Sequence, residues 1–392
     1  MALCLSSEHP HTTEALFSHT TNGNYTESGE LWHTLIKRQQ QQITADVAAL
    51  GSATLAIESC VVLAHGQERG HASISILNDI DDEAAPEWNF FYSNRLWYTQ
   101  HTATALFITG STCSCRGGCT ADGGCPCAVE AARVFDTDAY DMRGLLSDEE
   151  LKYKGPIVEC NAHCTCSSDC VNKACIRFYC NKFATVVQRG QTVNMHIKKT
   201  STKGWALFNA DTTIHRGQYI GTFAGELIDT EEADRRESDE TYFNTLNLGR
   251  DMDSNVSHVF GLDFWFLNRS LWHRHNDATA RDANTRPSDD ARDGAIAPNV
   301  HNMNFCIDCS RIGNFTKFIN HSCDPNLTVV GVYIDHSIDV PRITFFADRR
   351  IDPGEELCIS YVDTPGKEEE NSNIQYRECH CNSARCKGRL PI

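Results

Sequence analysis

Long hydrophobic runs are missing from this chain of 392 residues. Its clearest apolar stretches, residues 61–64 and 103–108, have the length of a core strand, far below the roughly 18 residues that a membrane span needs. The first ten residues also lack the basic start and the apolar run of a secretory signal. These absences predict a soluble protein of the cell interior without a membrane partner.

An excess of positive charge is also lacking. The chain has 35 Lys and Arg residues against 52 Asp and Glu residues, which gives a formal net charge of −17 at pH 7. Such a chain is poorly suited to hold nucleic acid through its phosphates and better suited to a positively charged partner. With 41% hydrophobic and 22% charged residues, it has the composition of a globular protein, and its length allows two or three domains.

Cysteine, in contrast, is abundant, with 20 residues. Nine of them lie between residues 113 and 170, and three more lie between residues 379 and 386. In a reducing compartment, cysteines that cluster with gaps of one and three residues favour metal binding over disulfide bonds. The two groups are therefore predicted to be separate metal sites.

The first group predicts a multinuclear zinc cluster. Its members form two runs with a gap of 32 residues between Cys127 and Cys160, and its Cys-x-Cys pairs suit sulfurs that bridge two metals. Three tetrahedral zinc ions need twelve ligand positions, which nine thiolates supply if three of them bridge. The alternative is two ordinary zinc sites with a spare cysteine. The predicted ligands are Cys113, Cys115, Cys119, Cys125, Cys127, Cys160, Cys164, Cys166 and Cys170.

The second group consists of Cys379, Cys381 and Cys386, which provide three of the four ligands that zinc requires. Cys323 is the best candidate for the fourth ligand, because it lies in a Pro-containing turn at residues 320–326 and not in an apolar stripe. The alternative role for Cys323 is that of a buried structural cysteine. If Cys323 does bind, zinc fixes the C-terminal tail to this turn.

Most of the regular structure is predicted to be strand. Residues 1–70 are polar and irregular, and residues 268–300 contain few large apolar side chains, which predicts a mobile insertion. Alternating or apolar stretches predict strands at residues 73–77, 89–96, 218–228, 256–267, 342–346 and 356–362. The result is a β-rich fold with few helices.

One helix is predicted to begin at residue 229, because Asp229 and Glu232 have capping-box spacing. Glu231 with Arg235 and Glu232 with Arg236 have the i,i+4 spacing that stabilises a helix.

These motifs together resemble the pre-SET, SET and post-SET modules of SET-domain histone-lysine N-methyltransferases that act on histone H3 lysine-9. The resemblance covers about residues 71–392. It rests on both cysteine groups, the Lys-Gly-Trp turn at 203–205, and the motifs FAGE at 223–226, NHSCDPN at 320–326 and GEEL at 354–357.

The resemblance implies a β-rich, mixed α+β SET fold with a pseudoknot-like crossing. It implies three zinc ions in the pre-SET cluster and one in the post-SET tail. The implied domains are residues 1–70 of unknown role, 71–185 as pre-SET, 186–362 as SET with the insertion at 268–300, and 363–392 as linker and post-SET motif.

The implied activity is the transfer of methyl groups from S-adenosylmethionine to a protein lysine. The substrate that the resemblance implies is lysine-9 of histone H3, in the chromatin of the nucleus. A neutral lysine amine must then lie in line with the methyl group and the sulfur. Tyr361 matches the family's catalytic tyrosine, and Lys317 takes a place usually held by arginine. The implied cofactor-binding residues are Lys203, Gly204, Trp205, Lys317, Asn320 and His321.

The lysine channel departs from the family pattern. Residues 258–263 match a stretch whose first residue is a tyrosine that points into the active site, so His258 replaces that tyrosine. An imidazole accepts a proton near neutral pH, which a phenol does not; the other interpretation is an impaired site. A second register, on residues 241–244, would keep Tyr242 as the tyrosine.

Other departures are Ala206, Ile359 and Pro391. Ile359 stands where phenylalanine or tyrosine in the family tunes the number of methyl groups, and a side chain without a hydroxyl there predicts di- or trimethylation. Two alternatives to histone methylation stay open: a catalytically impaired scaffold that binds peptide or cofactor, and a methyltransferase for a non-histone protein.

Overall fold

The computed structural model describes residues 25–66, 72–94, 96–98, 114, 139–141, 143–153, 157–159, 193–238, 259–262, 305–333, 340–361 and 376–391. Within these ranges short strands predominate, in agreement with the predicted β-rich fold. None of the described helices is both long and apolar enough to cross a membrane.

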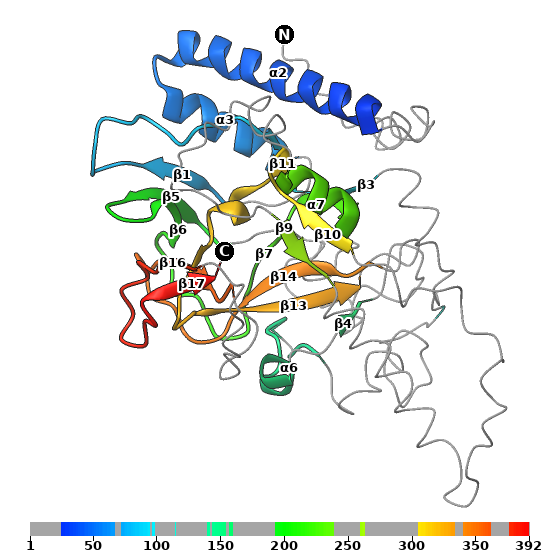
Figure 1. Ribbon diagram of the computed structural model, residues 1–392. Helices are drawn as coiled ribbons and strands as arrows, with labels where there is room; N and C mark the ends of the chain where they lie inside the picture. The colour runs from blue at the N-terminus through cyan, green and yellow to red at the C-terminus, as the bar shows by residue number, and fades with distance from the viewer. Residues whose placement is uncertain are drawn as a thin grey trace, which may run out of the picture.

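Two helices, α2 (Tyr25–Leu50) and α3 (Ala53–Gly66), stack on one side of the molecule (Figure 1). They correct the prediction of irregular structure for residues 25–66, the part of the region 1–70 that the structure describes. Gly51, with φ of 71°, ends α2 because its left-handed backbone suits glycine, and its N–H bonds to the carbonyl of Val47 at 2.8 Å. The apolar face of α3 packs into the main core through Ile57 and Val61.

Three sheets form the body of the molecule. The first has the order β1-β5-β6, the second β3-β8-β10-β9 and the third β4-β13-β14-β7. Their strands are β1 (Ile74–Leu77), β3 (Leu96–Tyr98), β4 (Ile157–Val158), β5 (Met195–Thr200), β6 (Gly204–Asn209), β7 (Tyr219–Thr222), β8 (Gly225–Asp229), β9 (Val259–Gly261), β10 (Phe305–Asp308), β13 (Leu327–Tyr333) and β14 (Arg342–Ala347).

Three strand pairs and three short helices complete the described part. The pairs are β2 (Phe91–Tyr92) with β11 (Ile312–Gly313), β12 (Asn320–His321) with β15 (Cys358–Ile359), and β16 (Tyr376–Glu378) with β17 (Arg389–Pro391). The helices are α6 (Asp148–Tyr153), α7 (Thr230–Ser238) and the 3₁₀ helix η4 (Phe315–Phe318).

The predicted strand at 218–228 divides into β7 and β8, which belong to different sheets. The chain crosses between the sheets at Phe223, whose ring packs against Phe345 and Phe260. Gly225 permits the close approach that follows, because a Cβ atom there would lie 2.6 Å from the carbonyl oxygen of Asp308. Of the predicted strand at 356–362, Cys358–Ile359 forms β15, and Glu356 pairs with Phe208 in an isolated bridge.

Helix α7 begins as predicted: the Asp229 carboxylate accepts the N–H of Glu232 at 2.8 Å. Glu232 and Arg236 form the predicted i,i+4 pair at 2.7 Å. Arg235, which the spacing pairs with Glu231, binds both oxygens of Glu232 at 2.7 Å in the structure. Glu232 is buried and already fixed, so it is the better partner.

Candidate cofactor and metal sites

The turn at 320–326 and the strand after the GEEL motif are fastened together. Strand β12 runs parallel to β15, with His321 opposite Ile359. The Asn326 side chain bonds across the junction, donating to the carbonyl of Glu356 at 2.8 Å and accepting the N–H of Cys358 at 2.9 Å. Two motifs that lie about 35 residues apart in the sequence are thereby joined side by side.

One carboxylate binds two of the residues predicted to bind the cofactor. Glu356 forms an ion pair with Lys203 and accepts a hydrogen bond from Asn320 Nδ2 at 3.3 Å. Asn320 Nδ2 also lies 3.4 Å from the carbonyl oxygen of Trp205. Gly204 lies between Lys203 and Trp205 with φ of 69°, a conformation that favours glycine. Lys203, Gly204, Trp205 and Asn320 therefore lie together.

Trp205 has an incompletely satisfied side chain. Its indole Nε1 is buried and has no hydrogen-bond acceptor in the part of the chain that the structure describes. Its ring lies 5.5 Å from the ammonium of Lys199. A buried donor without an acceptor is costly, so this indole fits a site whose ligand supplies the acceptor.

Lys317 faces another direction. It lies on η4, and its ammonium is 3.8 Å from the centre of the Phe90 ring. Burial lowers the pKa of Lys317 from its ordinary value. The ammonium is thus held by the aromatic face of Phe90, in the stretch expected to be pre-SET, whereas Lys203 and Asn320 converge on Glu356.

Tyr361 is held by the segment that leads into the heptapeptide turn, which is the turn at residues 320–326. Its hydroxyl donates to the carbonyl of Ile319 at 2.8 Å, and its backbone N–H donates to Nδ1 of His321 at 3.0 Å. Tyr361 as a whole is 43% exposed, but desolvation around its hydroxyl raises the pKa of the phenol above its ordinary value, so the hydroxyl keeps its proton at neutral pH. The other ring nitrogen of His321 lies 3.4 Å from Cys323 Sγ.

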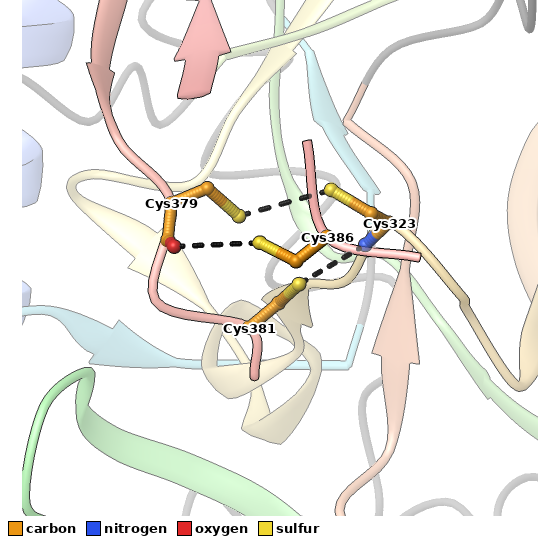
Figure 2. A group of neighbouring side chains, drawn as sticks. All are labelled: Cys323, Cys379, Cys381 and Cys386. Atoms are coloured by element: carbon orange, nitrogen blue, oxygen red, sulfur yellow. Dashed lines mark hydrogen bonds between the residues drawn. The ribbon is translucent and has the colours of Figure 1, made fainter. Parts of the chain in front are cut away.

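The second cysteine group forms a compact four-sulfur site (Figure 2). The sulfurs of Cys323, Cys379, Cys381 and Cys386 all lie within 4.8 Å of one another. Cys323 and Cys379 are 3.8 Å apart, which is the separation of about 3.8 Å that a tetrahedral zinc with Zn–S bonds of about 2.3 Å imposes. The donor set therefore fits zinc, and Cys323 is the member that comes from the heptapeptide turn.

Backbone amides around these sulfurs favour thiolates. The N–H groups of Lys387 and Gly388 donate to Cys323 and Cys386 at 3.5 and 3.4 Å. Although burial opposes it, the Ser383 hydroxyl and the N–H of Cys323 lower the pKa of Cys381 to about 6. A thiolate is the form that binds metal, and Cys381 is the sulfur whose surroundings favour it, whereas burial raises the pKa of Cys323 and that of Cys379, the latter to about 12.

Several predicted residues lie outside the described ranges. These are the two alternatives His258 and Tyr242, the insertion at 268–300, and the nine cysteines of the first group. Their roles stay predictions. Glu356 and Asn326, in contrast, are residues to which the sequence argument assigned no role, although both stand in quoted motifs.

Comparison with known families gives the class of the protein. A SET domain model matches residues 204–362, and a Pre-SET motif model matches residues 65–173. The chain belongs to the SET-domain proteins that carry a pre-SET motif, and the resemblance inferred from the sequence motifs is confirmed.

The curated relatives that the chain resembles include histone-lysine N-methyltransferases specific for H3 lysine-9. The H3 lysine-9 specific enzyme of Cryptococcus neoformans var. grubii is 31% identical over 318 residues, which cover 76% of this chain and 15% of that protein. The H3 lysine-9 specific enzyme dim-5 of Neurospora crassa is 28% identical over 338 residues, covering 81% of this chain and 88% of that protein.

Among solved structures, Arabidopsis thaliana SUVH6 in complex with SAM matches with a TM-score of 0.55 and 25% identity. The match covers 82% of this chain and 54% of that one. The chain thus spans most of the Neurospora relative and a much smaller part of the Cryptococcus protein and of SUVH6.

Proposed function

We propose that this protein transfers methyl groups from S-adenosylmethionine to lysine-9 of histone H3 and acts on chromatin in the nucleus. The observation that carries the proposal is the junction of β12 with β15, which brings Asn320, Glu356 and Tyr361 together. The names of the relatives, H3 lysine-9 specific methyltransferases, support the substrate.

S-adenosylmethionine supplies an activated methyl group when it is bound. The residues that would hold it are Lys203, Gly204, Trp205 and Asn320. The buried indole Nε1 of Trp205 has no acceptor among the described residues, so it would donate a hydrogen bond to the cofactor. Holding the reactants in line supplies most of the catalysis that a methyl displacement needs.

Tyr361 would orient the lysine amine. Because its hydroxyl proton is given to the carbonyl of Ile319, the lone pairs of the oxygen are left to accept an N–H of the substrate amine. The raised pKa of the phenol keeps Tyr361 neutral in this role. The partner is a lysine-rich histone tail, which agrees with the net charge of −17.

Zinc would have a structural role. The four-sulfur site would hold one ion and fix the tail to the heptapeptide turn. The predicted cluster of the first nine cysteines would hold three more.

The test is labelled-methyl transfer from S-adenosylmethionine to a histone H3 tail peptide, with an H3 peptide whose lysine-9 is replaced by alanine as the substrate control. We expect Tyr361→Phe to lower kcat about a hundredfold, because the oxygen that orients the amine is lost. Tyr376→Phe is the matched control, since Tyr376 is 40% exposed on β16. S-adenosylmethionine binding without transfer to any protein would indicate an impaired scaffold, and transfer only to other proteins in a nuclear extract would indicate a non-histone substrate.

A further inference from the structure

His321 lies between the four-sulfur site and Tyr361, and both of its ring nitrogens are engaged. Nδ1 accepts the backbone N–H of Tyr361 at 3.0 Å. Because a backbone amide only donates, Nδ1 carries no hydrogen, and the proton of the neutral ring is on Nε2. Nε2 lies 3.4 Å from Cys323 Sγ and therefore donates to that sulfur. The side chain of His321 is thus committed to the protein and not to a cofactor.

The same side chain is enclosed on its other sides. His321 is 8% exposed, and its ring centre lies 5.5 Å from that of Tyr361. The next residue, Ser322, donates its N–H to the carbonyl of Ile359 at 2.8 Å. Tyr361 is also fixed by its hydroxyl to Ile319, so the segment 319–322 contacts both ends of this tyrosine and the strand before it. A displacement of Cys323 would therefore be transmitted to Tyr361 through a few hydrogen-bonded residues.

Among the four sulfurs, only that of Cys323 comes from the heptapeptide turn, while the other three come from the tail. We propose that His321 is a positioning residue that couples the metal state of the tail site to Tyr361: ligation fixes Cys323, Cys323 orients the imidazole, and the imidazole places the Tyr361 backbone. Its effect on methyl transfer rests on the proposed function, whereas the coupling itself does not. A metal-bound thiolate remains an acceptor for N–H donors, so the ring orientation survives metal binding.

The chain offers substitutions that separate the two bonds. The Asn side chain places an acceptor oxygen near the position of Nδ1, whereas the longer Gln side chain places a donor near that of Nε2. His321→Asn therefore keeps the bond from the Tyr361 N–H, and His321→Gln keeps the bond to Cys323. His321→Leu removes both.

The main experiment is a double-mutant cycle on the full chain, labelled with nitrogen-15 only at its 11 tyrosines. Loss of one amide signal in Tyr361→Phe identifies the Tyr361 signal. Cys386→Ser disturbs the tail site without altering His321, Cys323 or Tyr361. We expect Cys386→Ser to shift the Tyr361 amide, and the shift to be about fivefold smaller in the His321→Leu background. Equal shifts in both backgrounds, or no shift with His321 present, would overturn the coupling.

A second readout covers the case in which His321→Leu fails to fold. The absorption spectrum of the cobalt-substituted chain should be retained in His321→Gln and altered in His321→Asn, because only Gln keeps the donor to Cys323. The kcat of methyl transfer should fall further in His321→Gln than in His321→Asn, with KM for the peptide changed less. If the two variants behave alike in both measurements, His321 does not couple the sites. If no variant and no parent chain transfers methyl groups, the proposed function fails while the amide and cobalt measurements still decide the coupling.

Discussion

Glu356 is the residue on which the cofactor side of the site depends most. Its carboxylate binds Lys203 and Asn320, and the two ion-pair side chains are only 16% and 18% exposed. Solvent therefore screens this pair less than an ordinary surface ion pair. The Lys203 backbone is fixed separately, by donation of its N–H to Thr200 Oγ1 at 3.0 Å. The carboxylate thus orients side chains on a backbone that is already in place.

Glu356→Gln should raise the dissociation constant of S-adenosylmethionine about fivefold, which is roughly 1 kcal/mol, because Lys203 loses its counter-charge while Asn320 keeps a partner. Isothermal titration calorimetry measures this without any methyl transfer. Glu355→Gln is the matched control, since Glu355 pairs with the exposed Arg349 at 2.8 Å. Equal effects of the two substitutions would contradict the role given to Glu356.

Glu150 makes stability depend on pH. It is 3% exposed on α6, and one of its oxygens has no hydrogen-bond partner among the described residues. Burial, with a smaller contribution from Glu149, raises the pKa of Glu150 to about 8. Between pH 4.5 and 8 the native state therefore binds more protons than the unfolded state, and the free energy of unfolding falls as the pH rises through this range.

Glu150→Gln should remove this slope. Compared with the parent chain, we expect the variant to gain about 3 kcal/mol in the free energy of unfolding between pH 5.5 and pH 8, measured by urea denaturation at both values. Other titrating groups are common to both chains, so only the difference between them is interpreted. Asp148→Asn, on the exposed part of the same helix, should leave the slope unchanged. A parallel pH dependence of Glu150→Gln and the parent chain would show that Glu150 is charged in the native state.

At the scale of elements, a buried guanidinium joins α7 to the second sheet. Arg236 Nη1 donates to Glu226 of β8 at 2.8 Å and to Asp308 of β10 at 2.7 Å, and its Nε donates to Glu232 at 2.7 Å. All four side chains are at most 6% exposed. Arg236 lowers the pKa of Asp308 against the opposing effect of burial, so the network is charged.

Arg236→Met should lower the free energy of unfolding by about 3–5 kcal/mol, because it leaves buried carboxylates without their counter-charge. Arg235→Met is the control from the next position on the helix. Arg235 is 54% exposed, so its loss should cost less than about 1 kcal/mol. Urea denaturation of both variants at neutral pH makes the comparison, and similar losses would mean that the network does not hold α7 in place.

The elements that the sequence predicts well are those decided by local chemistry. Asp229 caps α7 as its spacing to Glu232 indicates, and the alternating stretch around Ile74 forms β1. The sequence does not predict helix α2, because its polar, Gln-rich surface carries little hydrophobic periodicity. Its position depends on contacts distant in sequence: Gln39 donates to the carbonyl of Phe90 at 2.7 Å and accepts the N–H of Tyr92 at 3.0 Å. No local pattern contains such contacts.

In the candidate site, too, the sequence predicts what local chemistry decides and does not predict contacts between residues that are distant in sequence. Four cysteines could be grouped from the sequence because zinc requires four ligands and only three stand in the tail. The role of Glu356 could not be inferred, since its partner Lys203 lies 153 residues away and the ion pair exists only in the folded chain. The commitment of His321 to Cys323 and Tyr361 likewise depends on where β12 meets β15.

At the scale of the whole molecule, metal binding and charge are linked. Thirteen predicted thiolates with four zinc ions would make the formal charge of −17 more negative by about five. The tail site contributes to this charge close to the proposed lysine site, because Cys323 lies two residues beyond His321 in the same turn. Bound metal would therefore strengthen the attraction for a basic peptide while it fixes the tail.

The zinc content follows from this organisation. The full chain should hold about four zinc ions, measured by inductively coupled plasma mass spectrometry, and Cys386→Ser should hold about three, because three sulfurs do not complete a tetrahedral site. Cys60→Ser is the matched control: Cys60 lies on α3 against the main core, and its loss should leave the zinc content unchanged. A parent chain with about two zinc ions would refute the three-metal cluster. A parent chain with about four, whose content Cys386→Ser does not change, would refute the tail site alone, because the nine upstream cysteines do not include Cys386.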